Sequence, residues 1–287
     1  MGGQRTSATR DLVLSEAEDV RSAAEALDEG AAVAHGFGNF YALTARPDRE
    51  VVERVNRMKG RPADQVGSVT TVRERVGSVF DWTRLPSPLP RRQVEDLVDE
   101  LLHLGPFGLR GPAAAHIPPH LTARRQDVRT VQLIVPGYSC PSNAFLAEAL
   151  DRTGTGILSV TSVNRSRHLT GADHEPAHWR ADGVIAEFGH EPDVRVLAHA
   201  DDAAARRRHP HHATTSTTVL SFHHTPGYGR PGMPTLTLER HGSLSADHTR
   251  AIAANHGFTL ALSPHSPHRL PARTYPQPTP AARTTRD

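Results

Sequence analysis

The sequence has little that could cross-link, anchor or export the chain. Cys140 is its single cysteine, so no disulfide can form within the 287 residues. No apolar run approaches the length of a membrane-spanning helix. Residues 1–10 are polar and lack the apolar core of a signal peptide. From these absences we expect a cytoplasmic protein that makes no membrane contact.

Aromatic side chains are also scarce. They make up 5% of the chain, against 37% hydrophobic residues in all, so we expect a core built mostly from Leu, Val and Ala. The formal net charge is +2 and the isoelectric point is near 9.0. A mild positive balance of this size permits contact with phosphate or RNA without requiring it.

Hydrophobic periodicity predicts a mixed α/β chain, and 287 residues are enough for one large domain or two small ones. A disordered tail is expected at 1–11 and a proline-rich disordered tail at 261–287, and the Pro- and His-rich stretch 111–125 is expected to be loop. Helices are expected at 16–27, 46–58, 93–104, 143–150 and 247–256, and strands at 31–34, 68–72, 130–136 and from 157 onward.

A basic loop follows the expected helix at 46–58. Gly60 can end that helix and Pro62 cannot continue it, so Lys59 and Arg61 are presented on an irregular segment. Arginine offers a forked contact and lysine a point charge, and the pair suits a polyphosphate. The alternative is a solvated basic helix end that complements the helix dipole.

Two other stretches are candidates for ligand contact. The apolar strand from 157 leads into Ser162 and Asn164, at a strand end where α/β sheets bind ligands, although a plain polar turn is the alternative. The glycines on either side of Phe37 suit a tight turn with backbone close to a ligand, and the alternative is an ordinary strand–helix connection.

These stretches together resemble a known family. Residues 59–64, Lys-Gly-Arg-Pro-Ala-Asp, are similar to the Lys-x-Arg signature of the YrdC/Sua5/TsaC family, the threonylcarbamoyl-AMP synthases. Residues 161–166 resemble that family's Thr-Ser-Ala-Asn-x-Ser, 182–186 its next strand, 215–220 its Pro-Ser-Thr-Val-Val strand, and 236–242 its closing Leu-Arg-x-Gly. The motifs occur in family order over about residues 19–256.

The resemblance implies a fold, a site and cofactors. The fold would be a single domain over residues 12–260, built on an open, twisted mixed α/β sheet with flanking helices and a central basic cavity. Lys59 and Arg61 would be catalytic, with Mg²⁺ expected beside ATP. The implied nucleotide-binding residues are Lys59, Arg61, Ser162, Asn164, Ser216 and Arg240, and the implied substrate-binding residues are Tyr41, Phe37, Asn39 and Thr161.

The sequence departs from the family where threonine would be held. The family turn reads Pro-Thr-Glu/Asp-Thr-x-Tyr-Gly-Leu, and here Phe37, Gly38 and Asn39 replace its two threonines and its acid. Ile134 stands at the position of a family arginine. Losing hydroxyl and carboxyl partners removes the hydrogen bonds that make a site specific for threonine.

We therefore expect a divergent enzyme that forms a carbamoyl-adenylate from ATP, bicarbonate and an amino acid or amine other than threonine. One alternative is an authentic L-threonylcarbamoyladenylate synthase for tRNA modification. Another is a non-catalytic protein that binds nucleotide or double-stranded RNA through a basic concave face. The sequence leaves the oligomeric state open.

A histidine cluster offers a rival interpretation as a Zn²⁺ or Ni²⁺ site. No Cys or acidic residue stands at ligand spacing beside it, and its neighbours are Pro and Arg. We interpret it as incidental enrichment and expect no metal site of the protein's own. The cluster comprises His209, His211, His212, His223 and His224.

Overall fold

The computed structural model describes residues 12–171, 175–227 and 232–276. Its strands are β1 (Leu12–Val13), β2 (Ala32–Phe37), β3 (Phe40–Ala45), β4 (Ser68–Thr70), β5 (Phe107–Pro112), β6 (Thr122–Arg125), β7 (Val128–Val135), β8 (Leu158–Ser162), β9 (Val194–Ala198), β10 (Val219–Ser221), β11 (Thr235–Arg240) and β12 (Thr259–Leu262).

Its α-helices are α1 (Ala17–Asp28), α2 (Arg49–Met58), α3 (Arg91–Leu104), α4 (Ser142–Thr153), α5 (Arg167–Thr170), α6 (Ala181–Phe188), α7 (Asp202–Arg207) and α8 (Ala246–Asn255). Three 3₁₀ turns cover Arg73–Val79, Trp82–Arg84 and Pro119–Leu121. The five helices expected from periodicity correspond to α1, α2, α3, α4 and α8.

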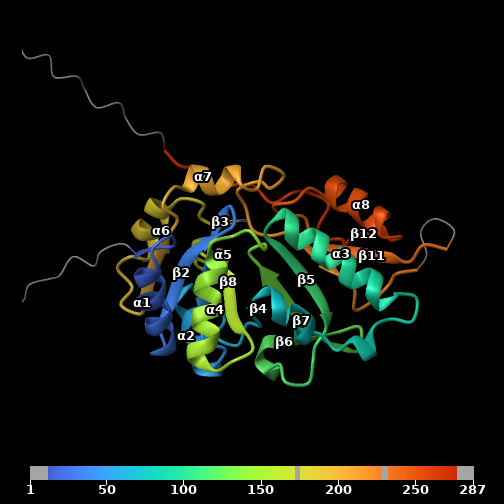
Figure 1. Cartoon of the computed structure of the whole chain (residues 1–287), viewed down its shortest axis with the longest axis horizontal. Helices are drawn as coiled ribbons and strands as arrows, with labels where there is room; N and C mark the ends of the chain where they lie inside the picture. The colour runs from blue at the N-terminus through green and yellow to red at the C-terminus, as the bar shows by residue number, and fades with distance from the viewer. Residues whose placement is uncertain (1–11, 172–174, 228–231, 277–287) are drawn as a thin grey trace, which may run out of the picture.

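All described strands belong to one open mixed sheet of twelve strands (Figure 1). The order is β1-β9-β2-β3-β8-β4-β7-β5-β10-β11-β12, and β6 pairs with β7 beside this path. The sheet contains both parallel pairs, such as β2–β9, and antiparallel pairs, such as β3–β8. The expected open, twisted α/β sheet with flanking helices is confirmed.

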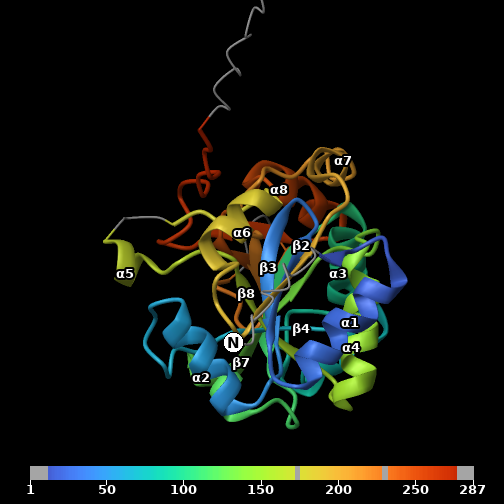
Figure 2. The same ribbon diagram turned by 90° about the vertical axis from the view of Figure 1, so that its left-hand side faces the viewer.

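Helices cover the sheet differently in its two halves. Across β2 and β3, α1 and α4 lie on one side and α2 on the other (Figure 2). Val33 packs with the α1–α4 core, while its neighbours Ala32 and Ala34 pack with α2 and α6, as alternation along a strand requires. In the half around β5 and β7, Leu109 joins the core beneath α3 and α8. The opposite face of that half carries polar side chains and hollows.

The glycine-containing turn forms a β-hairpin between β2 and β3, where Phe37 pairs with Phe40. Gly38 has φ +68°, a backbone conformation that the first position of a two-residue hairpin turn favours. A tight turn was expected here, and the strand–helix connection is excluded.

Two local expectations differ from the structure. Residues 182–186 lie in helix α6, because Val184 and Phe188 are buried one turn apart against the α2 core. The stretch 111–125, expected to be loop, contains the end of β5 and all of β6. Sequence composition missed β6 because it is a hairpin arm paired on one side only, with β7.

Part of the expected proline-rich tail packs on the domain. Ser266 is fully buried and its hydroxyl donates to the Leu238 carbonyl. Arg269 Nε donates to the Gly242 carbonyl at 2.9 Å, and the Tyr275 hydroxyl lies 2.8 Å from His178 Nδ1. Polar contacts from separate side chains order residues 263–276 although the segment has few apolar residues. The expected tails at 1–11 and 277–287 lie outside the described residues.

None of the helices among these described ranges is both long and apolar enough to cross a membrane.

Gly242 is required by close packing of backbone on backbone. A Cβ at this position would lie 2.3 Å from the Ser216 carbonyl oxygen and 2.4 Å from Thr217 carbonyl atoms. We predict that Gly242→Ala lowers the free energy of unfolding by at least about 2 kcal/mol, measured by urea denaturation. Gly77→Ala is the matched control, since no atom lies within 4 Å of its Cβ position. Equal stability of the two variants would contradict this packing.

Candidate nucleotide-binding site

A central cavity of about 270 Å³ lies on the polar face of the sheet, over β3, β8, β4 and β7. Its apolar wall is formed by Phe40, Ala42, Ile134 and Val160. The polar side chains that meet there include Arg61, Arg240, Gln132, Thr161, Ser162, Ser216 and Thr217. Segments far apart in the sequence therefore contribute to one concave surface.

Arg61 reaches this cavity because α2 ends just before it. Lys59 is the C-terminal cap of the helix, and Gly60 follows with φ +72°, a left-handed conformation that glycine adopts without strain. The chain then turns so that Arg61 Nη1 donates to Thr161 Oγ1 at 2.8 Å. Burial lowers the pKa of the Arg61 guanidinium.

Lys59 lies behind the cavity wall and is fully buried. Its ammonium group donates to the Ser162 carbonyl and lies 3.3 Å from Thr161 Oγ1. Burial lowers the pKa of Lys59 well below its ordinary value, and the charges of Arg61 and Arg165 lower it further against the opposing effect of Glu187. Lys59 thus fixes the end of β8 from beneath.

Arg240 closes the far side of the cavity from the end of β11. Its Nε donates to the Thr217 carbonyl and its Nη2 to Thr217 Oγ1, both at 2.7 Å. Burial lowers the pKa of Arg240 to about 10, and the nearby charges of Arg110 and Arg61 contribute. Cations this close and this poorly solvated repel one another, so an anion between them would be stabilised.

A side hollow of about 410 Å³ adjoins the central cavity and shares Arg61, Ser162 and Arg240 with it. Asn164 lines this side hollow, and the Ser162 hydroxyl donates to Asn164 Oδ1 at 2.6 Å. The structure therefore brings together Arg61, Ser162, Asn164, Ser216 and Arg240, which the sequence motifs placed at the nucleotide.

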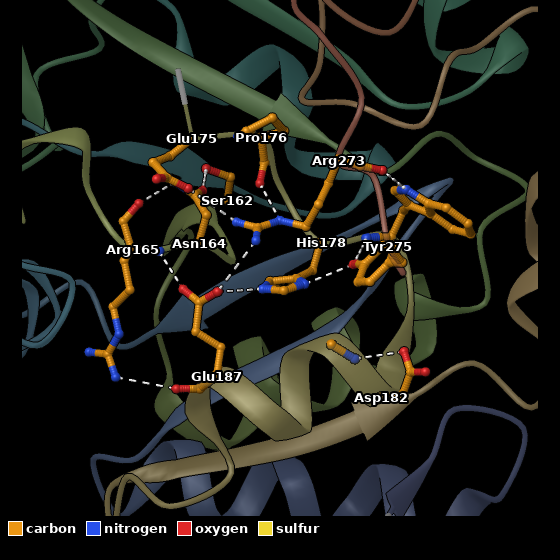
Figure 3. Close-up of polar contacts among 12 residues, drawn as sticks. Ser162, Asn164, Arg165, Glu175, Pro176, His178, Asp182, Glu187, Arg273 and Tyr275 are labelled. Carbon is orange, nitrogen blue, oxygen red and sulfur yellow. Dashed lines mark hydrogen bonds and ion pairs between the residues drawn. The ribbon is translucent and has the colours of Figure 1, made fainter. Parts of the chain in front are cut away.

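A polar network supports the rim of the side hollow (Figure 3). Glu187 accepts from the Arg165 backbone N–H at 2.7 Å and from His178 Nε2 at 2.7 Å, and Arg273 Nη1 lies 3.6 Å away. Burial would raise the pKa of Glu187, but His178, the Arg165 amide and Arg273 outweigh it and lower that pKa. The C-terminal segment thereby joins the wall of the site.

Three expected substrate-binding residues do not line the central cavity. Phe37 is fully buried in an apolar cluster behind the cavity wall, with its ring 5.5 Å from that of Phe40. Asn39 is 2% exposed and donates to the Ala213 carbonyl, and Tyr41 is fully buried with its hydroxyl 2.7 Å from Asp202. Alternation along β3 explains this, since Phe40 and Ala42 face the cavity and Tyr41 faces the opposite side. Thr161, the fourth, does line it.

Sequence reasoning missed Arg110 and Gln132, which face each other across β5 and β7. Arg110 donates to the Gln132 side chain, and Gln132 Nε2 donates to Ser68 Oγ at 2.8 Å. The signal was available in β5, where Leu109 belongs to the core and its neighbour Arg110 must face the other side. Sequence reasoning also overlooked that Lys59 is the only lysine in the sequence, which sets this position apart in an arginine-rich chain.

The described lining offers no cage for Mg²⁺. Among the described residues, no carboxylate lines the central cavity, and Glu175 is the one acidic side chain of the side hollow. Elsewhere in the described ranges, no three His, Cys, Asp or Glu residues gather at metal-binding distance. Mg²⁺ is commonly held by substrate phosphates and water, so it would enter here as the counterion of ATP.

Solved structures of other proteins share this architecture. Sua5 from P. abyssi, in complex with L-threonine, superposes with a TM-score of 0.57 at 18% identity, over 86% of this chain and 60% of that one. The chain has the YrdC/Sua5-like fold. YciO from E. coli superposes with a TM-score of 0.51 at 15% identity, over 72% of this chain and 84% of that one.

A hypothetical protein from Streptococcus mutans superposes with a TM-score of 0.60 at 12% identity, over 84% of this chain and 93% of that one. No family model matches the sequence, and no curated protein matches it either. The chain spans about three fifths of the length of the Sua5 structures. At these identities the likeness concerns the fold alone.

The titration of Lys59 measures directly how far burial lowers the pKa of its side chain. As the only lysine, Lys59 gives a single signal in protein labelled with ¹³C at lysine Cε. We predict an NMR titration midpoint well below 10.5, because burial disfavours its charged form. The unfolded chain then binds more protons between the two pKa values, so the free energy of unfolding rises with pH up to the ordinary lysine pKa.

Two controls accompany this titration. The same signal in denaturant should titrate near the ordinary lysine value of about 10.4. In Lys59→Met the rise of stability with pH should be smaller. A midpoint at or above 10.5 in the folded protein would show that Lys59 is solvated or paired with a carboxylate.

Proposed function

We propose that the protein is a divergent threonylcarbamoyl-AMP synthase-like nucleotidyltransferase. It would form a carbamoyl-adenylate from ATP, bicarbonate and an amino acid or amine. The observation that carries this proposal is the meeting of Arg61 and Arg240 with the hydroxyls of Thr161, Ser162 and Ser216 in one cavity whose described lining contains no carboxylate. Such a cavity suits a triphosphate, because forked donors match phosphate oxygens.

The reaction would proceed in two displacements. The amine nitrogen attacks the carbon of bicarbonate, water leaves, and a carbamate forms. A carbamate oxygen then attacks the α-phosphorus of ATP, the bond from that phosphorus to the bridging oxygen breaks, and pyrophosphate leaves with the electron pair. Arg61 and Arg240 would stabilise the charge on the transferring and leaving phosphates, where fixed cations in a water-poor site act most strongly. Mg²⁺ bound to the phosphates would add to this stabilisation.

The amine is proposed to differ from threonine. The P. abyssi protein was solved with L-threonine, but the apolar wall of the cavity here presents Phe40 and Ala42 of the hairpin with Ile134 and Val160 of the neighbouring strands. Apolar side chains cannot replace the hydrogen bonds that discriminate a hydroxyl-bearing substrate. An authentic threonylcarbamoyl-AMP synthase, or a non-catalytic protein that binds nucleotide or double-stranded RNA, remains the alternative proposal, and the assay below separates them.

We predict release of pyrophosphate from Mg-ATP and bicarbonate with at least one member of a panel of amino acids and amines, and no stimulation by threonine. The measurement is pyrophosphate release for each amine, with ATP binding followed in parallel by calorimetry. Turnover with threonine would support the authentic synthase. ATP binding without turnover for any amine would support the non-catalytic alternative.

Variants test the site in the same assay. Arg61→Ala and Lys59→Ala should each abolish turnover and lower ATP affinity about tenfold or more, because the first removes a charged hydrogen-bond donor from the cavity and the second removes the contacts that fix the end of β8. Arg57→Ala is the matched control, since Arg57 lies one turn earlier on α2, pairs with Glu53 and lines neither hollow of the site. Unchanged ATP affinity in Arg61→Ala, or an equal loss in Arg57→Ala, would contradict the assignment.

A further inference from the structure

A second hollow lies beside the central cavity on the same face of the sheet. It has a volume of about 690 Å³ and lies over β5, β10, β11 and β12. Arg240 and Gln132 line both hollows, so the second hollow adjoins the central cavity. Concavities of this size are typical of small-molecule sites. Neither the sequence motifs nor the proposed reaction uses this space.

The hollow carries a surplus of positive charge. Arg110 Nε forms an ion pair with Glu239, the one carboxylate of the lining, at 2.6 Å. Within the described residues, Arg125 and Arg240 have no carboxylate at ion-pair distance. Arg124, at the mouth, pairs with Asp127 at 3.2 Å and is 75% exposed. Without nucleotide, an anion would therefore find two arginines, Arg125 and Arg240, that have no carboxylate partner, and Arg125 remains when a triphosphate in the central cavity engages Arg240.

The floor of the hollow is fixed by hydrogen bonds. Arg110 is 8% exposed and is held between Glu239 and Gln132. His223 is 5% exposed, and its Nδ1 lies 2.6 Å from Ser221 Oγ. Burial lowers the pKa of His223 to about 4, so its ring is neutral near pH 7 and serves as a hydrogen-bonding group. Donors held in advance in this way lower the cost of ordering a ligand.

We propose that this second hollow binds a small ligand that carries a phosphate group, at a site separate from the nucleotide. Arginine forks and neighbouring hydroxyl and imidazole groups are the contacts that phosphate esters prefer. The depth of the floor favours a small molecule over duplex RNA. A rigid duplex would touch Arg124 and Arg125 at the mouth, but it could not reach Arg110 or His223 below.

The site does not depend on the adenylation chemistry. Its floor residues Arg110, Glu239 and His223 line the second hollow and not the central cavity. Its ligand could therefore bind whether or not the central cavity activates a carbamate. Binding is measured on the full chain by calorimetry with inorganic phosphate as the probe, with and without a saturating non-hydrolysable ATP analogue.

We expect wild-type protein to bind phosphate under both conditions. Arg110→Gln combined with Glu239→Gln, which removes the ion pair as a unit, should weaken phosphate binding about tenfold or more. Arg125→Gln, at the exposed mouth, should weaken it about threefold and does not threaten the fold. Arg61→Gln in the central cavity should weaken ATP binding and leave phosphate binding unchanged. Arg195→Gln, at the exposed position of β9, is the charge-matched control and should change neither.

Three results would overturn the proposal. The first is an absence of phosphate binding to wild-type protein. The second is phosphate binding that is lost in Arg61→Gln but retained in both variants of the second hollow. The third is duplex RNA binding that depends on the second hollow and that inorganic phosphate does not displace. Failure of ATP to bind would instead count against the proposed function, because the phosphate titration without nucleotide is independent of it.

Discussion

The candidate site depends on a cluster of poorly solvated cations, two of which line the central cavity while the third, Lys59, lies beneath its wall. Lys59, Arg61 and Arg240 come from the end of a helix and the end of a strand far apart in sequence, and the described lining of the central cavity supplies no carboxylate. Burial lowers the pKa of all three. Their mutual repulsion is compensated in part by carbonyl and hydroxyl oxygens of Thr161, Ser162 and Thr217. A polyanion in the central cavity would relieve it further, and this supports the proposed binding of a nucleotide.

Alternation along the strands places these groups. In the half of the sheet around β5 and β7, helices pack one face, so every second side chain of a strand such as β5 is apolar and buried, and the intervening ones face the hollows. On β5, Leu109 is buried in the core and the adjacent Arg110 faces the second hollow. The only lysine of an arginine-rich chain lies beneath this surface at Lys59, where a guanidinium would be bulkier and would demand more hydrogen-bond acceptors. The same face carries the second hollow, because the sheet extends past the central cavity to β12.

The sequence was informative where a residue's environment is set by local chain geometry. Gly60 ends α2 and presents Arg61, and the residues after β8 place Ser162 and Asn164 beside it. It was misleading where tertiary packing decides. Tyr41 matches a family position and Phe37 replaces one, so both were expected to bind substrate. The β2–β3 hairpin buries both side chains instead. Residues 182–186 are apolar enough for a strand, but burial at one-turn spacing makes them helical. The segment 263–276 is ordered by single polar contacts that composition cannot reveal.

The most direct test of this account is a crystal structure of the protein with Mg²⁺ and a non-hydrolysable ATP analogue. The account predicts triphosphate density in the central cavity, with phosphate oxygens within hydrogen-bond distance of Arg61 and Arg240, and the nucleoside beside Ser162 and Asn164. Density for the triphosphate in the second hollow, or at a surface away from Arg61, would contradict it.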